Sequence, residues 1–117
     1  MGSWGYEPLD SDTSLDWVDN TAKILADRIE TTLKKSGAYP EEVRAAAHYI
    51  VSASENDFLS DYDVLGLIPL AIEKLNKILE NKKWIDEWNS TKDIKSSIKN
   101  QIKILESLKN KVRLSDR

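Results

Sequence analysis

Apolar residues recur at steps of three and four along most of this chain. This spacing places them on one face of an α-helix. The first such stretch predicts a helix that begins near Asp12 and ends near Lys35 or Ser36, where Gly37 stops it. Residues 1–11, which contain two glycines and a proline, predict an irregular lead-in. The inward face of the helix is expected to hold Trp17 or Val18, Ala22, Leu25, Ile29 and Leu33.

The same spacing predicts three more helices and one short helical turn. A second helix is expected over 40–54, because proline suits the first position of a helix. A third helix is predicted over about 68–81, and a short amphipathic turn over 84–88 follows it. The inner face of the second helix is expected to consist of Val43, Ala46, Ala47, Ile50 and Ala53. That of the third is expected to consist of Leu70, Ala71, Leu75, Ile78 and Leu79.

A last helix is predicted over about 91–113, and Ser90 with Asp93 resembles a capping box at its start. It has the longest apolar stripe, formed by Ile94, Ile98, Ile102, Leu105, Leu108 and Val112. Its opposite face is rich in lysine, with Lys92, Lys95, Lys99 and Lys103. Two interpretations stay open: this is the closing helix of a bundle, or it is a coiled-coil-like surface for self-association.

The segment between the second and third helices, 55–66, is acidic and loop-like. No segment shows sustained alternation of apolar and polar residues, so no sheet is predicted. The chain is therefore predicted to be an all-α, single-domain antiparallel helical bundle over 1–117, with four main helices and one short helix. Its length of 117 residues suits one domain.

Composition excludes several kinds of chemistry. The chain has no cysteine, which excludes disulfides, thiolate metal sites and a cysteine nucleophile. It has one histidine, which excludes a site that needs two imidazoles from one chain. We see no signal peptide and no apolar run near the roughly 20 residues that cross a bilayer, so we expect a cytoplasmic protein without a membrane partner.

Charge is distributed unevenly. The net charge is −3, and this mild acidity argues against nucleic-acid binding. Residues 1–80 hold seven basic and fifteen acidic side chains, a net of −8, whereas 81–117 have a net of +5. The asymmetry indicates either two partner surfaces or a basic last helix packed beside an acidic first one.

The chain opens with Met-Gly-Ser-Trp-Gly and continues through an acidic helix start to Asp16-Trp17. This opening resembles the bacterial domain-of-unknown-function family 4259, whose members begin Met-Gly-x-Trp-Gly and continue through an acidic helix start to Asp-Trp. An alanine-rich segment at 45–47 and the stretch 81–88 before the last helix are also similar to that family. The resemblance implies a small, soluble bacterial domain and no particular activity.

The chain departs from this family at several positions. Leu9 stands where the family usually has phenylalanine, and Ser11 where it has asparagine. His48 replaces a glutamate that often follows the central alanines, and 82–84 replaces a Ser-Glu-Leu segment. The change at His48 weakens any catalytic role for that central position.

Two groups of acidic residues are candidate binding residues. Asp12 and Asp16 are four residues apart, so a helix places both carboxylates on one face. They suit the positive end of the helix dipole, or a divalent cation with help from Glu7 or Asp10. The second group lies in the acidic segment, where Asp57, Asp61 and Asp63 form either a solvated loop or a docking surface for a basic protein.

The tryptophans form two pairs, Trp4 with Trp17 and Trp84 with Trp88. Trp4 is expected to fold back onto the first helix near Trp17 or onto the last helix, and the alternative is an exposed recognition surface. One member of the second pair is expected to be buried and the other exposed. His48, the one histidine of the chain, lies in mid-helix without a nucleophile motif.

These features favour a protein-binding module, such as an immunity protein that neutralises a basic toxin. The binding residues that we expect are Trp4, Asp12, Asp16, Trp17, Asp57, Asp61, Asp63 and Trp88, and we expect no catalytic residue, metal or cofactor. The alternative is a small metal-dependent enzyme that uses the N-terminal acidic residues. A further alternative is self-association through the last helix, so the chain is expected to be a monomer or a weak homodimer.

Overall fold

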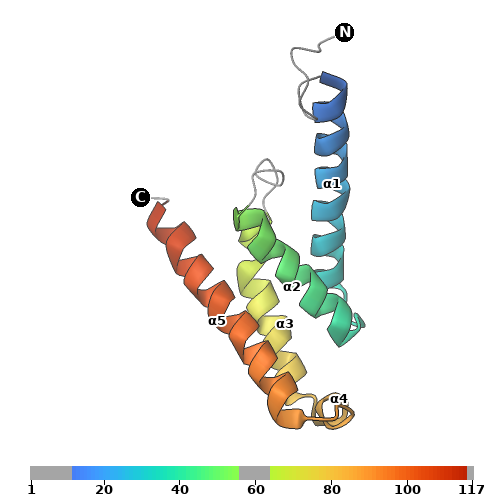
Figure 1. Cartoon of the computed structure of the whole chain (residues 1–117), viewed down its shortest axis with the longest axis vertical. Helices are drawn as coiled ribbons and strands as arrows, with labels where there is room; N and C mark the ends of the chain where they lie inside the picture. Colours follow the sequence, from blue (N-terminus) through green and yellow to red (C-terminus); the bar gives the residue numbers. More distant parts are fainter. Residues whose placement is uncertain (1–11, 56–63, 116–117) are drawn as a thin grey trace.

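The computed structural model describes residues 12–55 and 64–115, and these form five α-helices and one 3₁₀ turn (Figure 1). The prediction of an all-α helical bundle with four main helices and one short helix is confirmed. The elements are α1 (Asp12–Lys34), α2 (Pro40–Glu55), the 3₁₀ turn η2 (Leu65–Leu67), α3 (Ile68–Glu80), α4 (Lys82–Asp86) and α5 (Thr91–Ser115). None of the helices in these two stretches has the length and apolar character that crossing a bilayer requires.

The four long helices run alternately in opposite directions, with α2 and α3 between α1 and α5 (Figure 1). α2 packs against α1, α3 and α5, and α3 packs against α5 along its other side. Short connections favour this order, because a chain that turns within a few residues brings the next helix back beside the last.

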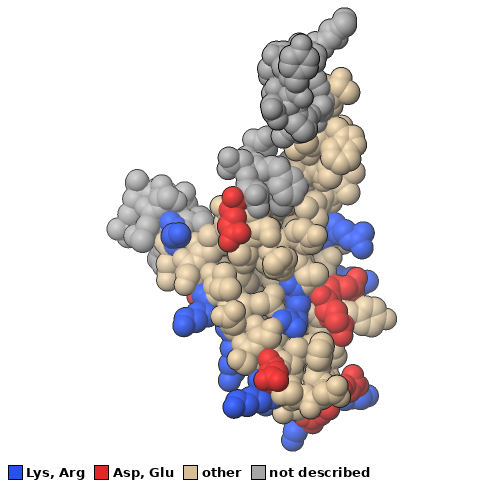
Figure 2. Space-filling model, viewed as in Figure 1, with Lys and Arg blue, Asp and Glu red and all other residues tan. Residues whose placement is uncertain are grey.

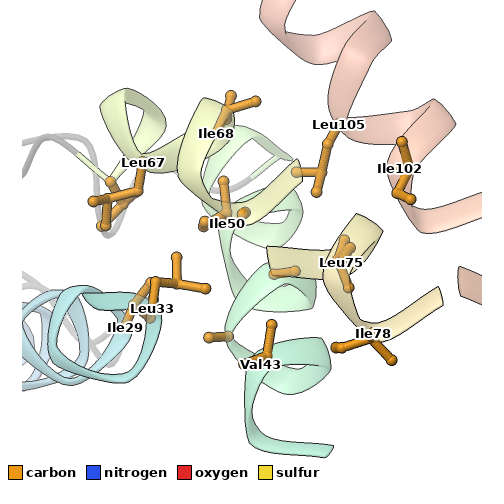
Figure 3. Close-up of a cluster of buried hydrophobic side chains, with 14 of the residues drawn as sticks. Ile29, Leu33, Val43, Ile50, Leu67, Ile68, Leu75, Ile78, Ile102 and Leu105 are labelled. Carbon is orange, nitrogen blue, oxygen red and sulfur yellow. The ribbon is translucent and has the colours of Figure 1, made fainter. Parts of the chain in front are cut away.

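One continuous core joins these helices. Figure 3 shows Ile29 and Leu33 of α1 pointing toward Ile50 of α2, with Leu75 of α3 and Leu105 of α5 on the other side of α2. All five side chains are buried, and no polar side chain is buried among the described residues. Burying a side chain of this size stabilises the fold by about 1.5–3 kcal/mol.

Several helix ends follow from local chemistry. The backbone N–H of Asp93 donates to Ser90 Oγ over 3.2 Å, which confirms the predicted cap of α5. The side chain of Asn81 accepts from the backbone N–H of Trp84 over 3.2 Å and so caps α4. α4 therefore begins at Lys82 and ends before Trp88, two residues earlier at each end than predicted.

The inner face of α1 differs from the prediction. Ala26 replaces Leu25 in the buried set, which is Ala22, Ala26, Ile29 and Leu33, and Leu25 is only partly buried. Trp17 or Val18 was expected inside; Trp17 is 68% exposed and Val18 is half-buried. The reason is that α1 is longer than the helices beside it, so its N-terminal half extends past the ends of α2 and α3 (Figure 1).

The long stripe of α5 faces the core of its own chain. Ile94, Ile98, Ile102 and Leu105 are buried against the other helices. Burial therefore favours the closing helix of a bundle over a surface for self-association. The turn η2 was not predicted, because its three residues Leu-Gly-Leu are too few for a periodic pattern.

Gly37 follows α1, and its backbone does not adopt the left-handed conformation that favours glycine. No atom would lie within 4 Å of an added Cβ. We expect Gly37→Ala to stabilise the protein by about 0.4–1 kcal/mol, because alanine lowers the entropy of the unfolded chain. Urea unfolding measures this change, and a loss of stability would show that the glycine is required at this turn.

Candidate functional site

One side of α1 has a regular stripe of charged side chains. We call Asp16, Asp19, Asp27 and Glu30 the acidic stripe. Successive members are three or eight residues apart, so they share this side. All four residues are exposed. Lys23 and Lys34 lie between and beyond them, and Lys34 Nζ is 3.3 Å from Glu30 Oε1. The stripe with its two lysines therefore has an excess of two negative charges.

The C-terminal end of the acidic stripe, at Asp27 and Glu30, borders a cavity between α1 and η2. The cavity has a volume of about 330 Å³. Asp27, Glu30 and Lys34 provide its charged wall, and Ala26, Val64, Gly66 and Leu67 complete the lining. The lining is mainly polar, and its two carboxylates outnumber the one ammonium group of Lys34, so the recess has a net negative charge that suits the cationic head of a lysine or arginine.

The predicted acidic residues are only partly placed by the structure. Asp16 is exposed at the N-terminal end of the acidic stripe. Asp12 is the first residue of α1, and its side chain lies outside the described part. Trp4, Asp57, Asp61 and Asp63 lie outside the described residues. Asp63 directly precedes Val64 in the sequence, and Val64 lines the cavity.

Sequence reasoning missed Asp27 and Glu30. They lie eleven and fourteen residues after Asp16, which is three and about four helical turns, so the helical spacing contained the signal. What the sequence lacked was any sign that η2 would pack beside this part of α1. Across the described stretches, no group of three or more histidine, cysteine, aspartate or glutamate side chains is placed to hold a metal ion.

The tryptophan pair at α4 has a structural role and an exposed member. Trp84 is half-buried against the core, and its Nε1 donates to Glu41 Oε1 of α2 over 2.9 Å. The rings of Trp84 and Trp88 meet edge to face, with centroids 5.5 Å apart and an interplanar angle of 66°. Of the expected buried and exposed pair, Trp88 is exposed at 44%, whereas Trp84 is only half-buried.

Trp17 and His48 lie elsewhere. Trp17 is on a different side of α1 from the acidic stripe, because it follows Asp16 by about 100° of helical rotation. His48 is exposed in the middle of α2, with its ring centroid 6.0 Å from that of Tyr49. The structure therefore does not bring Trp17, Trp88 and the acidic residues together into one site.

A polar contact between α2 and α5 was not predicted. Arg44 donates from Nε to Gln101 Oε1 over 2.7 Å and from Nη2 to Ser97 Oγ over 2.6 Å. Gln101 Nε2 in return donates to the backbone oxygen of Arg44 over 3.1 Å. Burial lowers the pKa of Arg44 from its usual value, and these neutral acceptors hold the guanidinium in place.

We expect Gln101→Ala to lower the free energy of unfolding by about 1–2 kcal/mol, because it removes two hydrogen bonds and leaves a half-buried charged donor without its acceptor. Chemical denaturation checks this. Lys99→Ala on the exposed face of α5 is the matched control, since lysine and glutamine have similar helix propensities. An equal effect of both changes would show that the Arg44 contact contributes nothing to stability.

Comparisons with known proteins found no matching family model, no similar curated protein and no similar solved structure.

Proposed function

We propose that this chain is a protein-binding module that docks on a basic protein through the acidic stripe of α1 and the cavity beside it. The observation that carries the proposal is the joint position of Asp27 and Glu30, whose side chains line one recess next to η2. A protruding lysine or arginine of a partner would enter this recess. Asp16, nearer the N-terminus on the same side of α1, would contact further basic side chains of the partner.

The distribution of charge supports a basic partner. Figure 2 shows Lys and Arg side chains along the left edge of the molecule, which α5 forms. The acidic stripe lies on α1, which α2 and α3 separate from α5 (Figure 1). Opposite charges on separate helices favour one orientation of a charged partner, because complementary potentials increase the association rate and like charges oppose the wrong approach.

The most concrete version of this proposal is an immunity protein that neutralises a basic toxin. A small acidic helical protein can block a basic active site by occupying it, and this requires a charged surface rather than catalytic chemistry of its own. Membership of the domain-of-unknown-function family 4259 stays a prediction from the opening motif. A bacterial, cytoplasmic protein is the setting that this version requires.

The test is capture of partners from an extract of the native host on the immobilised protein at low ionic strength. We expect a basic protein to bind and to be released as salt increases, because screening weakens exposed charge pairs. The double variant Asp27→Lys, Glu30→Lys should lose that protein. If the captured protein is a toxin, co-expression of this chain should restore growth, and the double variant should not.

Asp86→Lys is the matched control, because it reverses an exposed acidic side chain on α4, away from the stripe. It should capture the same basic protein as the original chain. The proposal is wrong if the control and the double variant lose the protein equally, or if the captured proteins are not basic.

A further inference from the structure

A groove with an apolar floor lies between the C-terminal halves of α2 and α5. It has a volume of about 540 Å³, and its floor consists of Val51 of α2 with Ile104 and Leu108 of α5. Val51 and Leu108 are half-buried against the core, whereas Ile104 is 41% exposed. The helices of the described stretches therefore leave an apolar surface uncovered between them.

The walls of this groove are held in place by the bundle. α2 and α5 run in the same direction (Figure 1), and Arg44 joins them through its 2.7 Å hydrogen bond to Gln101. The groove begins one to two helical turns beyond that contact, because Val51 follows Arg44 by seven residues and Ile104 follows Gln101 by three. Walls that are already in position cost a partner little ordering when it binds.

The two walls differ in charge. The α5 wall has Lys103 and Lys111, and both are exposed. Within the described stretches neither lysine forms an ion pair. Lys99, also exposed, lies four residues before Lys103 and so extends the positive wall along the helix. The α2 wall ends at Glu55. An occupant that complements both walls is acidic toward α5 and basic toward Glu55.

The spacing of the lysines matches the repeat of another helix. Lys103 and Lys111 are eight residues apart, which is about 12 Å along α5 by helical rise. A helix packed alongside would reach both lysines with carboxylates about seven or eight residues apart. Apolar side chains at steps of three and four between those carboxylates would cover Ile104 and the rest of the floor, as amphipathic helices do in hydrophobic grooves.

We propose that this groove is a docking site for an amphipathic helix of a partner protein, with carboxylates along the flank that faces α5. Its apolar side chains cover Val51, Ile104 and Leu108, and its carboxylates pair with Lys103 and Lys111. This site is separate from the acidic stripe of α1 and takes a partner of opposite charge. It therefore goes beyond the proposed function and does not rest on it.

Shape and composition favour a helix over other anionic partners. The apolar side chains line a recess, whereas a helix that binds a bilayer surface turns its apolar face outward into the lipid. Nucleic acids are bound by aromatic rings that stack on bases and by arginine. The described lining of the groove contains neither kind of side chain. A peptide helix supplies both the apolar stripe and the carboxylates that this groove lacks.

The probe is a fluorescently labelled synthetic helix with leucines at steps of three and four, glutamates on one flank and lysines on the other. Fluorescence anisotropy should show saturable binding to the full chain. A second peptide with lysine in place of every glutamate should bind about tenfold more weakly or worse, because like charges meet at the α5 wall. This difference should decrease as salt increases.

Variants of the chain locate the contact. Ile104→Asp should weaken binding of the acidic peptide by about tenfold or more, because it removes apolar area and sets a carboxylate against the peptide. Ile104 is exposed, so the helical circular dichroism spectrum should not change. Lys103→Glu should weaken binding as well. Lys95→Glu is the matched control, since it reverses the same charge at an exposed position of α5 outside the groove. Asp27→Lys should also bind the peptide normally, which separates this site from the acidic stripe.

Several results would overturn the proposal. One is that the acidic peptide does not bind, or that its lysine counterpart binds equally well. Another is an equal loss of binding in Lys103→Glu and Lys95→Glu. Stronger binding to phosphatidylglycerol vesicles, lost in Ile104→Asp, would overturn it in favour of a membrane surface. Peptide binding that appears only in Phe58→Ser would overturn it in favour of residues 56–63, which follow Glu55 in the sequence.

Discussion

The packing of α1 against α2 is the constraint on which the rest of this molecule depends. α1 is held through Ala22, Ala26, Ile29 and Leu33, which all lie in its C-terminal part. A buried stripe occupies only one side of a helix, so two other sides of α1 stay exposed along this length. One side has the acidic stripe, and the other has the exposed apolar side chains of Trp17 and Ile24. The separation of these two surfaces follows from where the buried stripe lies.

The two surfaces would act by different physical means. Carboxylates beside η2 attract a basic group over a distance, and their effect on association decreases as salt increases. The exposed apolar side chains have no such range, because burial of Trp17 and Ile24 contributes only on contact. A partner on the acidic stripe would therefore leave Trp17 and Ile24 uncovered.

The helices were predictable because each buries a stripe with a period of three to four residues. Ile98 and Leu105 show this: their spacing alone placed them inside, and both are fully buried. Trp17 shows the limit, because the same pattern allowed either Trp17 or Val18 inside, yet no helix of the described stretches buries Trp17. Asp27 and Glu30 became a candidate site only through the position of η2. Arg44 was missed for the same reason, since its acceptors lie 53 and 57 residues away in the sequence.

The central claim is that the N-terminal half of α1 depends on contacts from outside the described chain, whereas the C-terminal half is held by the core. Amide hydrogen exchange in dilute protein tests it most directly. We expect the amides of residues 14–21 to exchange quickly, while those of Ile29 and Leu33 stay protected. Equal and strong protection of residues 14–21 in dilute protein would contradict the claim.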